Sequence, residues 1–418
     1  MKNIIHRRDS CRGCESHDLD LMLSLKPTPI GDAYVSGDKI NLAQPKFPID
    51  LYMCKACGLA QLLDVIDPDI LYGDYIYQTS SSTELISHFE TYADNVLRRC
   101  NLQHGALVVD IGSNDGTLLR NFQKRGMIVV GVEPAQHIAT LAASQGIPSI
   151  NNFFTPKLAK QMVEEHGHAN LITANNVFAN IDDLLSWVTG VDILLADDGV
   201  FVFESYYLLD LIENSVFDFI YHEHLSSFSV RPIQALFQRV GLFLVAVERV
   251  DTKGGSLRYY VQRPNGPLKS DDTVNKMLRY EENFGLYRQE TFFKFSEKIC
   301  RLKEKTLAFL SEARKKGKSI AGFGASITCT TLIYHFEIGE YLDYLVDDNK
   351  AKQGRFSPGL HLPVFPSSVI NERKPDYVII LAWRFSDIII NKYRGYLEGG
   401  GTFVVSIPEL RICTNQIR

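Results

Sequence analysis

Two pairs of cysteines near the start of the chain have the spacing of metal ligands. The first C-x-x-C pair is Cys11 and Cys14, and the second, about forty residues later, is Cys54 and Cys57. A tight C-x-x-C turn lets two thiolates reach one ion, and four thiolates complete the tetrahedral shell of Zn²⁺ with no open position for a substrate. Because four of the eight cysteines are paired in this way, the pattern favours a metal site over disulfides. The sequence therefore predicts one structural zinc site.

A glycine-containing turn is the second candidate site. It joins the apolar, β-branched run 106–109 to a helix that starts near Thr117, and it reads D-x-G-x-N-x-G. This differs from the G-x-G-x-x-G turn of dinucleotide sites, and its acids repel phosphate but tolerate a cationic, phosphate-free nucleoside such as S-adenosylmethionine. An ordinary strand-to-helix turn is the alternative. The residues of the turn that we expect to bind the cofactor are Asp110, Gly112, Ser113, Asn114, Asp115 and Gly116.

The ends of two further predicted strands place polar side chains at the same edge of a sheet. The apolar run 127–132 ends in Glu133 and Pro134, and an acid at this point suits the two hydroxyls of a ribose. The strand predicted at 171–174 is followed by three asparagines. Ligands of parallel sheets lie beyond the carboxyl ends of the strands, so we expect these side chains to face the site. They are Asn175, Asn176 and Asn180.

A Tyr-His-Glu-His cluster, Tyr221 to His224, could supply a general base near neutral pH together with groups that orient it. A metal role is less suited, because adjacent His-Glu-His lacks the i, i+4 spacing of a helical zinc motif. In a strand, His222 and His224 would share one face and Glu223 would point away. A pair of structural histidines is the alternative.

Two shorter stretches could present groups to a substrate. Segment 71–82 carries Tyr75 and Tyr77 among hydroxyl residues, but a strand followed by a serine N-cap at Ser81 explains it equally well. The stretch K-G-G-S-L-R could meet an anionic substrate or cap a sheet edge. Its candidate residues are Lys253, Ser256 and Arg258.

The last third of the chain repeats the pattern of strand, glycine turn and helix. Apolar runs at 319–323, 344–347, 377–383 and 402–408 predict a second Rossmann-type unit. Its turn could bind a nucleotide or diphosphate at a helix N-terminus, or the unit could serve only to pack and to position a substrate. The residues expected to contact substrate are Gly322, Gly324, Ser326, Asp347 and Trp383.

These sites require an α/β protein of more than one domain. Alternating strands and helices predict parallel sheets, and 418 residues are too many for a single core. We expect a zinc-binding module at 1–82, a Rossmann-like cofactor domain at 83–270, and a helical connector with a second Rossmann-like domain at 271–418.

Charge and composition narrow the function classes. The net charge of -5 and the absence of a basic run between the cysteine pairs disfavour nucleic-acid binding. No apolar stretch is long enough to cross a bilayer, and the first residues lack the apolar core of a signal peptide. We therefore expect a cytoplasmic protein that binds neither nucleic acid nor membrane. A monomer is expected, and an oligomer is the alternative that the sequence leaves open.

Taken in order, these motifs resemble one family. The paired cysteines, the D-x-G-x-N-x-G turn, Tyr-His-Glu-His, Gly-Gly-Ser-Leu-Arg and Gly-Phe-Gly-Ala-Ser are similar to those of S-adenosylmethionine-dependent sugar C-methyltransferases of deoxysugar pathways. The resemblance extends from about Cys11 to Pro408, which is nearly the whole chain. It implies a zinc domain, a central methyltransferase domain and a C-terminal Rossmann-like domain, with the sugar nucleotide held between the last two.

The resemblance also implies a substrate and a mechanism. The acceptor would be C3 of a nucleotide-linked 4-keto sugar, with His224 as the base that removes the C3 proton. Tyr221, Asn180 and either Tyr75 or Tyr77 would donate hydrogen bonds to the enolate oxygen. Asn180 stands where we expect the family to have a histidine, so a proton-transfer role at that position is in doubt. Zinc would take no part in the chemistry.

Three other functions fit parts of the pattern. They are an oxygen- or nitrogen-directed methyltransferase on the same scaffold, a zinc-ribbon protein that binds or modifies RNA, and a nicotinamide oxidoreductase that uses the turn at Gly322–Ser326.

Overall fold

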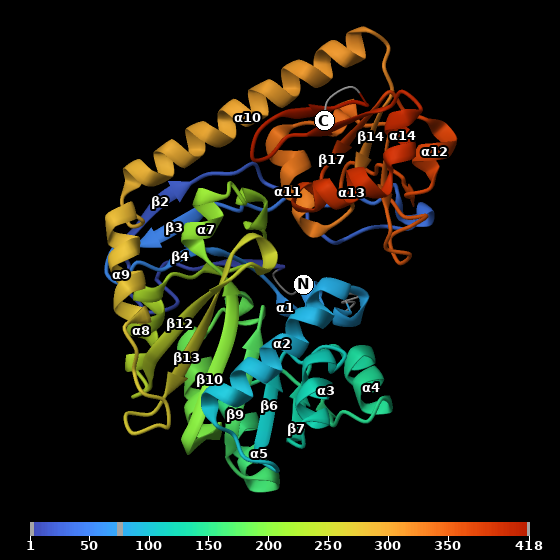
Figure 1. Ribbon diagram of the computed structural model, residues 1–418. Coiled ribbons are helices and arrows are strands. Elements are labelled where there is room, and N and C mark those ends of the chain that lie inside the picture. The colour runs from blue at the N-terminus through green and yellow to red at the C-terminus, as the bar shows by residue number, and fades with distance from the viewer. Residues whose placement is uncertain (1–3, 73–77, 416–418) are drawn as a thin grey trace. The chain divides into compact units, whose positions relative to one another are not determined.

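The computed structural model describes residues 4–72 and 78–415 (Figure 1). They form two compact units, each built from several segments of the chain. Unit 1 comprises Met1–Asp20, Tyr52–Leu209 and Leu225–Tyr287. Unit 2 comprises Leu21–Leu51, Asp210–His224 and Arg288–Arg418. The three contiguous domains expected from the sequence stay a prediction. Among the described residues, no helix has the length and hydropathy needed to cross a membrane.

A seven-stranded sheet lies at the centre of unit 1, in the order β12-β13-β10-β9-β6-β7-β8. From β10 to β8 the neighbouring strands are parallel, whereas β13 runs antiparallel to both of its neighbours. The strands are β6 (Leu107–Ile111), β7 (Ile128–Val132), β8 (Ser149–Ile150), β9 (Ala169–Asn175), β10 (Leu195–Tyr206), β12 (Phe243–Val250) and β13 (Ser256–Gln262). The helices are α2 (Thr83–Cys100), α3 (Thr117–Lys124), α4 (Gln136–Ser144), α5 (Pro156–His166), α6 (Leu184–Leu194), α8 (Val230–Gln238) and α9 (Thr273–Phe284).

Both faces of this sheet are buried, as expected for a largely parallel sheet. Successive side chains of a strand point to opposite faces. In β10, Val200 and Val202 join the apolar cluster formed with α2 and α3. Phe201 and Phe203 point the other way, and their rings lie 5.8 and 5.9 Å from that of Phe237 in α8. The continuous apolar run in the sequence is the consequence of this two-sided burial.

The cysteine module of unit 1 is built from short strands. β1 (Ile5–Arg7) pairs antiparallel with β5 (Asp64–Ile66). β4 (Ala60–Leu62) pairs antiparallel with β11 (Ser226–Ser227), which comes from much later in the chain. β3 (Leu51–Cys54) leads into the second cysteine pair. The module is therefore attached to the segment that follows Tyr-His-Glu-His.

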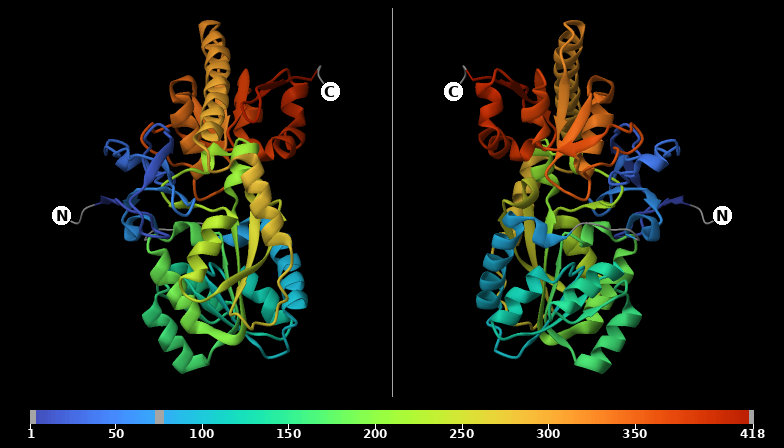
Figure 2. Two further views of the ribbon diagram at one scale, coloured as in Figure 1. Left: turned by 90° about the vertical axis from the view of Figure 1, so that its left-hand side faces the viewer. Right: turned by 90° about the vertical axis from the view of Figure 1, so that its right-hand side faces the viewer.

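Unit 2 contains a six-stranded sheet in the order β16-β15-β14-β17-β18-β19. All neighbouring pairs are parallel except β18 with β19. The strands are β14 (Ile320–Phe323), β15 (Tyr344–Asp347), β16 (Val364–Pro366), β17 (Tyr377–Ile380), β18 (Thr402–Val405) and β19 (Arg411–Cys413). The helices are α10 (Gln289–Lys315), α11 (Ile327–Phe336), α12 (Val369–Arg373), α13 (Ser386–Lys392) and α14 (Arg394–Glu398). Figure 2 shows α10 as one continuous helix. The predicted α/β fold with a second Rossmann-like sheet is confirmed.

Element ends account for the differences from expectation. The amphipathic pattern of residues 182–196 predicts a helix; the observed helix α6 is shorter, because Asp183 accepts a hydrogen bond from Ser186 N at 3.0 Å as its N-cap and β10 begins at Leu195. Ser82, not Ser81, caps α2, with its hydroxyl accepting from Leu85 N at 3.3 Å.

Candidate active site and metal site

The turn after β6 needs its glycines. Gly112 has φ +73° and Gly116 has φ +75°, a region that side-chain-bearing residues rarely adopt. A Cβ atom on Gly112 would lie 2.9 Å from Val177. The turn also uses Asn114 at φ 49°, which asparagine tolerates better than most residues. The predicted tight turn is therefore present in the structure.

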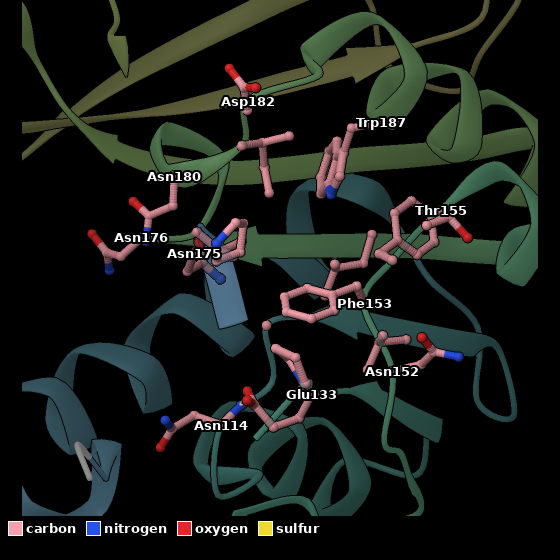
Figure 3. Close-up of a pocket in the computed structure, with 18 of the residues that line it drawn as sticks. Asn114, Glu133, Asn152, Phe153, Thr155, Asn175, Asn176, Asn180, Asp182 and Trp187 are labelled. Atoms are coloured by element: carbon pink, nitrogen blue, oxygen red, sulfur yellow. Dashed lines mark hydrogen bonds between the residues drawn. The ribbon is translucent and has the colours of Figure 1, made fainter. Parts of the chain in front are cut away.

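A cavity of about 430 Å³ lies at the carboxyl ends of β6, β7 and β9, which is within the usual range for small-molecule sites. In Figure 3, Asn175, Asn176 and Asn180 lie together on one side of the cavity. Asn152 and Thr155 lie on the other side, and Phe153 lies between the two groups. The lining residues that the sequence predicted are Gly112, Asn114, Glu133, Pro134, Asn175, Asn176, Asn180 and Lys253.

Four other residues of the turn are not among the residues that line this cavity, and their role in cofactor binding stays a prediction. Asp110 is buried and accepts a hydrogen bond from Thr173 Oγ1 at 2.6 Å, and burial raises its pKa to about 7. Asp115 accepts from Ser80 N at 2.9 Å and Thr117 N at 3.2 Å, so it fixes the start of α3. These carboxylates are used within the protein, and their charge is not presented to a ligand. The four residues are Asp110, Ser113, Asp115 and Gly116.

Glu133 is the acid of the cavity. Its Oε1 accepts from Ala135 N at 2.8 Å, and its Oε2 accepts from Asn114 N at 3.0 Å. Burial raises the pKa of this carboxyl, whereas the two main-chain donors lower it. Each oxygen has a second lone pair, so the carboxylate can still accept hydrogen bonds from ribose hydroxyls.

Two asparagines of the cavity have an amide atom with no partner among the described residues. Asn175 Oδ1 accepts from Glu204 N at 3.0 Å, which leaves Nδ2 buried and unpaired. Asn180 Oδ1 is likewise buried and unpaired. Such atoms cost about 1–3 kcal/mol each unless a ligand or water satisfies them. Glu133, the unpaired amide atoms and the aromatic side chains that line the cavity together fit an adenosine-containing ligand.

Sequence reasoning missed the apolar wall of the cavity. Phe153 is 42 % exposed although it is a large hydrophobic residue, and Trp187 of α6 also lines the cavity. Both give apolar ring surface for a base or sugar. The sequence did offer one signal for this wall, namely an aromatic residue, Phe153, in the loop that follows residues 147–150.

The four cysteines are placed for a metal ion. Their Sγ atoms all lie within 4.8 Å of one another, with Cys11 and Cys57 at 3.6 Å and Cys14 and Cys54 at 3.5 Å. A tetrahedral Zn²⁺ with Zn–S bonds of about 2.3 Å needs sulfur atoms about 3.8 Å apart, so the donor set fits zinc. No position is left for a substrate, which makes the site structural.

Tyr221 to His224 form a turn, so the strand geometry does not apply. His224 Nδ1 lies 2.8 Å from Phe219 O, and because a carbonyl can only accept, Nδ1 carries the proton. His224 Nε2 lies 2.8 Å from Tyr221 Oη, and the two rings stack at 4.0 Å. In the neutral tautomer with this proton on Nδ1, Nε2 holds a lone pair that accepts from the phenol. The geometry therefore suits a neutral imidazole with its basic nitrogen next to a proton donor.

His222 has a different environment. It is buried, and its Nε2 donates to Phe47 O at 3.2 Å. Burial lowers its pKa to about 4, so it is neutral at pH 7. Glu223, between the two histidines, is 9 % exposed. These positions favour a positioning role for His222 and leave His224 as the stronger candidate base.

The predicted substrate ligands of β13 are used inside the sheet. Ser256 Oγ donates to Thr252 O at 3.0 Å. Arg258 is 2 % exposed and forms ion pairs with Glu204 at 2.7 Å and Glu248 at 3.1 Å. A buried cation is usually paired within the protein, and these carboxylates are the partners of Arg258, so its contact with an anionic substrate stays a prediction. Lys253, at φ 56°, lines the cavity instead.

The glycine turn of unit 2 is also engaged internally. Gly324 has φ +118°, and Ser326 precedes α11 as its N-cap residue. Asp347 Oδ2 accepts from Ala325 N at 2.6 Å, so the acid at the tip of the second strand closes onto the turn. A Cβ atom on Gly322 would meet Leu345 at 2.7 Å, which explains this glycine by packing.

The remaining predicted residues lie elsewhere. Trp383 is buried in unit 2, and its Nε1 donates to Asp218 Oδ2 at 3.0 Å. Arg384 NH1 also binds this carboxylate, at 3.2 Å. Tyr75 and Tyr77 fall outside the described residues.

Three family models match consecutive parts of the chain. They are a "Putative zinc binding domain" at 11–72, a "Methyltransferase domain" at 86–247 and a "C-methyltransferase C-terminal domain" at 251–408. The chain is 33% identical over 413 residues to the C-methyltransferase NovU of Streptomyces niveus, covering 99% of this chain and 98% of that protein.

Solved structures resemble the chain more distantly. Magnesium protoporphyrin IX methyltransferase of Synechocystis PCC 6803 is 14% identical and aligns with a TM-score of 0.35, covering 46% of this chain and 90% of the other. A methyltransferase of Clostridium acetobutylicum ATCC 824 is also 14% identical, with a TM-score of 0.34 and coverage of 47% and 95%. The similarity to NovU, which extends over nearly the whole of both chains, is stronger than the similarity to these structures.

Proposed function

Because the chain belongs to the family of S-adenosylmethionine-dependent C-methyltransferases with an N-terminal zinc-binding domain, we propose that it methylates C3 of a nucleotide-linked 4-keto deoxysugar. The observation that carries the carbon-directed chemistry is the pair Tyr221 and His224. It combines a phenol and an imidazole nitrogen 2.8 Å apart. A 4-keto sugar presents two adjacent groups that match this pair, the carbonyl oxygen at C4 and the acidified hydrogen at C3.

The proposed reaction needs one proton transfer and one bond exchange. His224 Nε2 takes the C3 proton, and the C–H electron pair becomes the enolate. S-adenosylmethionine, when bound, would supply an electrophilic methyl group, which the enolate carbon C3 would take as the S–CH₃ bond breaks and its electron pair stays on the sulfur of S-adenosylhomocysteine. In this step the phenol of Tyr221 turns from Nε2 to the ketone oxygen, where it stabilises the developing negative charge. The hydrogen bond from His224 Nδ1 to Phe219 O keeps the imidazole oriented.

Residues of the cavity in unit 1 would hold the donor. Glu133 would accept hydrogen bonds from the ribose hydroxyls, and Asn175 Nδ2 would donate to the ligand. Asn180 and either Tyr75 or Tyr77 remain predicted donors to the enolate oxygen. Holding the two reactants in line supplies much of the acceleration in reactions of this kind.

A deuterium-exchange experiment tests the carbon-directed step apart from methyl transfer. The protein is incubated in D₂O with nucleotide 4-keto sugars and S-adenosylhomocysteine, and NMR follows the C3 hydrogen. We expect exchange at C3 without methylation, and a C3-methyl product when S-adenosylmethionine replaces the product analogue. A product methylated on oxygen or nitrogen, without exchange at C3, would transfer the chain to the alternative class of methyltransferase.

A further inference from the structure

Arg12 occupies an unusual position for a cation. It lies inside the first C-x-x-C pair, between Cys11 and Cys14, yet only 2 % of it is exposed. Its main-chain N–H and its NH1 both donate to Gln61 Oε1, at 3.0 and 3.3 Å. An arginine is rarely buried unless its guanidinium is paired, so the other contacts of this side chain define what it does.

The first of these contacts is with the wall of the cofactor cavity. Arg12 Nε and NH2 each lie 3.4 Å from Oδ1 of Asp182, which lines the cavity. Arg8 NH1 reaches the same oxygen at 3.1 Å, and His6 Nε2 lies 3.3 Å from Oδ2. The next residue, Asp183, is the N-cap of α6. Residues of the cysteine module thus hold the point at which α6 enters the cavity wall.

The second contact is with the main chain that follows the candidate base. Arg12 NH1 donates to Leu225 O at 2.8 Å, and Leu62 N donates to the same oxygen at 2.9 Å. Leu225 comes directly after His224 in the chain and leads into β11. One guanidinium therefore bonds to two segments that lie 170 and 213 residues away in the sequence.

We propose that Arg12 is a positioning residue that couples the metal site to the methyl-donor cavity. Zinc bound by Cys11 and Cys14 fixes the short turn from which the Arg12 side chain extends. The guanidinium then holds Asp182 at the cavity wall and Leu225 next to the candidate base. Loss of the metal releases the turn, and the cavity wall loses this support. Zinc thereby affects donor binding without touching either reactant.

The test measures binding of S-adenosylhomocysteine by calorimetry, so it is independent of the sugar acceptor and of the proposed base. Arg12→Met keeps an apolar side chain of similar length and removes every hydrogen-bond donor of the guanidinium. Arg7→Met is the matched control, because Arg7 also belongs to this module and also pairs with a carboxylate, that of Asp64, but contacts neither Asp182 nor Leu225. Metal analysis confirms that both variants hold one zinc per chain.

We expect Arg12→Met to bind S-adenosylhomocysteine about tenfold more weakly, as for the loss of a charge-assisted hydrogen bond, and Arg7→Met to bind it normally. Removing zinc from the wild type with a chelator should weaken binding by a similar factor. Chelation of Arg12→Met should weaken it no further, since the two changes break the same connection.

Several results would overturn the proposal. One is an affinity for S-adenosylhomocysteine that does not change when zinc is removed from the wild type, or that does not change in zinc-loaded Arg12→Met. Another is that the effects of the variant and of chelation are independent of each other. A third is that circular dichroism shows loss of the whole fold on chelation. If Arg12→Met does not fold, Asp182→Asn answers the same question from the other side of the contact. Its affinity should be insensitive to chelation, and a metal dependence like that of the wild type would contradict the coupling.

Discussion

The two glycine turns of this protein share a pattern and differ in what their atoms do. Both follow the first strand of a Rossmann-like order, and both have an acid at the tip of the second strand, Glu133 in unit 1 and Asp347 in unit 2. Each acid accepts two main-chain N–H groups: those of Ala135 and Asn114 for Glu133, and those of Ala325 and Asn349 for Asp347.

The difference lies in the surroundings of the turns. Glu133 lines a cavity that also has unpaired amide atoms. In unit 2, the turn carbonyl of Ala325 accepts from Lys352 Nζ at 2.7 Å, and Lys352 also pairs with Asp32. A strand, a turn and an acid therefore specify the fold, whereas a ligand site also requires polar atoms that the fold leaves unpaired. The segment Asp210–His224, which carries the candidate base, belongs to unit 2.

Of the changes considered, replacing His224, the candidate base, should reduce activity most. His224→Ala removes the only group proposed to take the C3 proton, so we expect kcat to fall by about 10²–10⁴-fold. Affinity for S-adenosylhomocysteine should be unchanged, because the donor cavity belongs to unit 1. Steady-state kinetics and calorimetry measure the two effects separately. Wild-type turnover in this variant would remove His224 from the mechanism.

The two acids provide the most direct test of the comparison. Glu133→Gln and Asp347→Asn are matched changes. Each replaces one carboxylate oxygen, which accepts from a main-chain N–H, by an NH₂ group that cannot accept. We expect both to lower the free energy of unfolding by about 1–3 kcal/mol. Only Glu133→Gln should also weaken binding of S-adenosylhomocysteine, by about 10–100-fold, as for lost bonds from ribose hydroxyls to a charged acceptor. Equal loss of affinity in both variants would show that the turns are not functionally distinct.

Tyr221→Phe separates the two roles of the candidate catalytic pair. It removes the donor proposed for the enolate oxygen and leaves the imidazole in place. We expect a fall in kcat of about 10–100-fold, which is less than for His224→Ala, together with continued C3 exchange at a reduced rate. A variant as inactive as His224→Ala would mean that the phenol is essential for the proton transfer itself.

The sequence predicted the elements of both units well, because their signal is local. The sequence places apolar, β-branched runs at 106–109 and 127–132, and the structure has the parallel strands β6 and β7 there, at Leu107–Ile111 and Ile128–Val132. The spacing within each C-x-x-C pair is likewise a local signal, and the fold then brings the two pairs together.

The contacts that decide function are not local, and the sequence did not predict them. Arg258 in the sequence is a cation near a glycine pair, and nothing nearby shows that Glu204 will pair with it in the sheet. The bonds from Arg12 to Asp182 and Leu225 likewise depend on the fold of the whole unit. Asp110 is acidic in the sequence, but its burial in the structure raises its pKa to about 7.

The last prediction concerns the stability of unit 1 and the charge of Asp110, the residue before the last of β6. Burial raises the pKa of Asp110 from 3.8 to about 7, so the folded state disfavours its ionised form. The resulting penalty is absent below about pH 4, grows as the pH rises, and becomes constant above about pH 7. Asp110→Asn keeps an acceptor for Thr173 and cannot ionise. Relative to this variant, the wild type should therefore lose unfolding free energy on the order of 1 kcal/mol per pH unit across that window.

Urea unfolding of both proteins at a series of pH values measures this difference. Asp198→Asn, at an exposed carboxylate, is the control and should run parallel to the wild type. If Asp110→Asn also runs parallel to the wild type, Asp110 is ionised in the folded protein at neutral pH. The charge near the unit 1 turn would then be available to a cationic donor, as the sequence alone suggested, and the two turns would differ more in charge than in unpaired atoms.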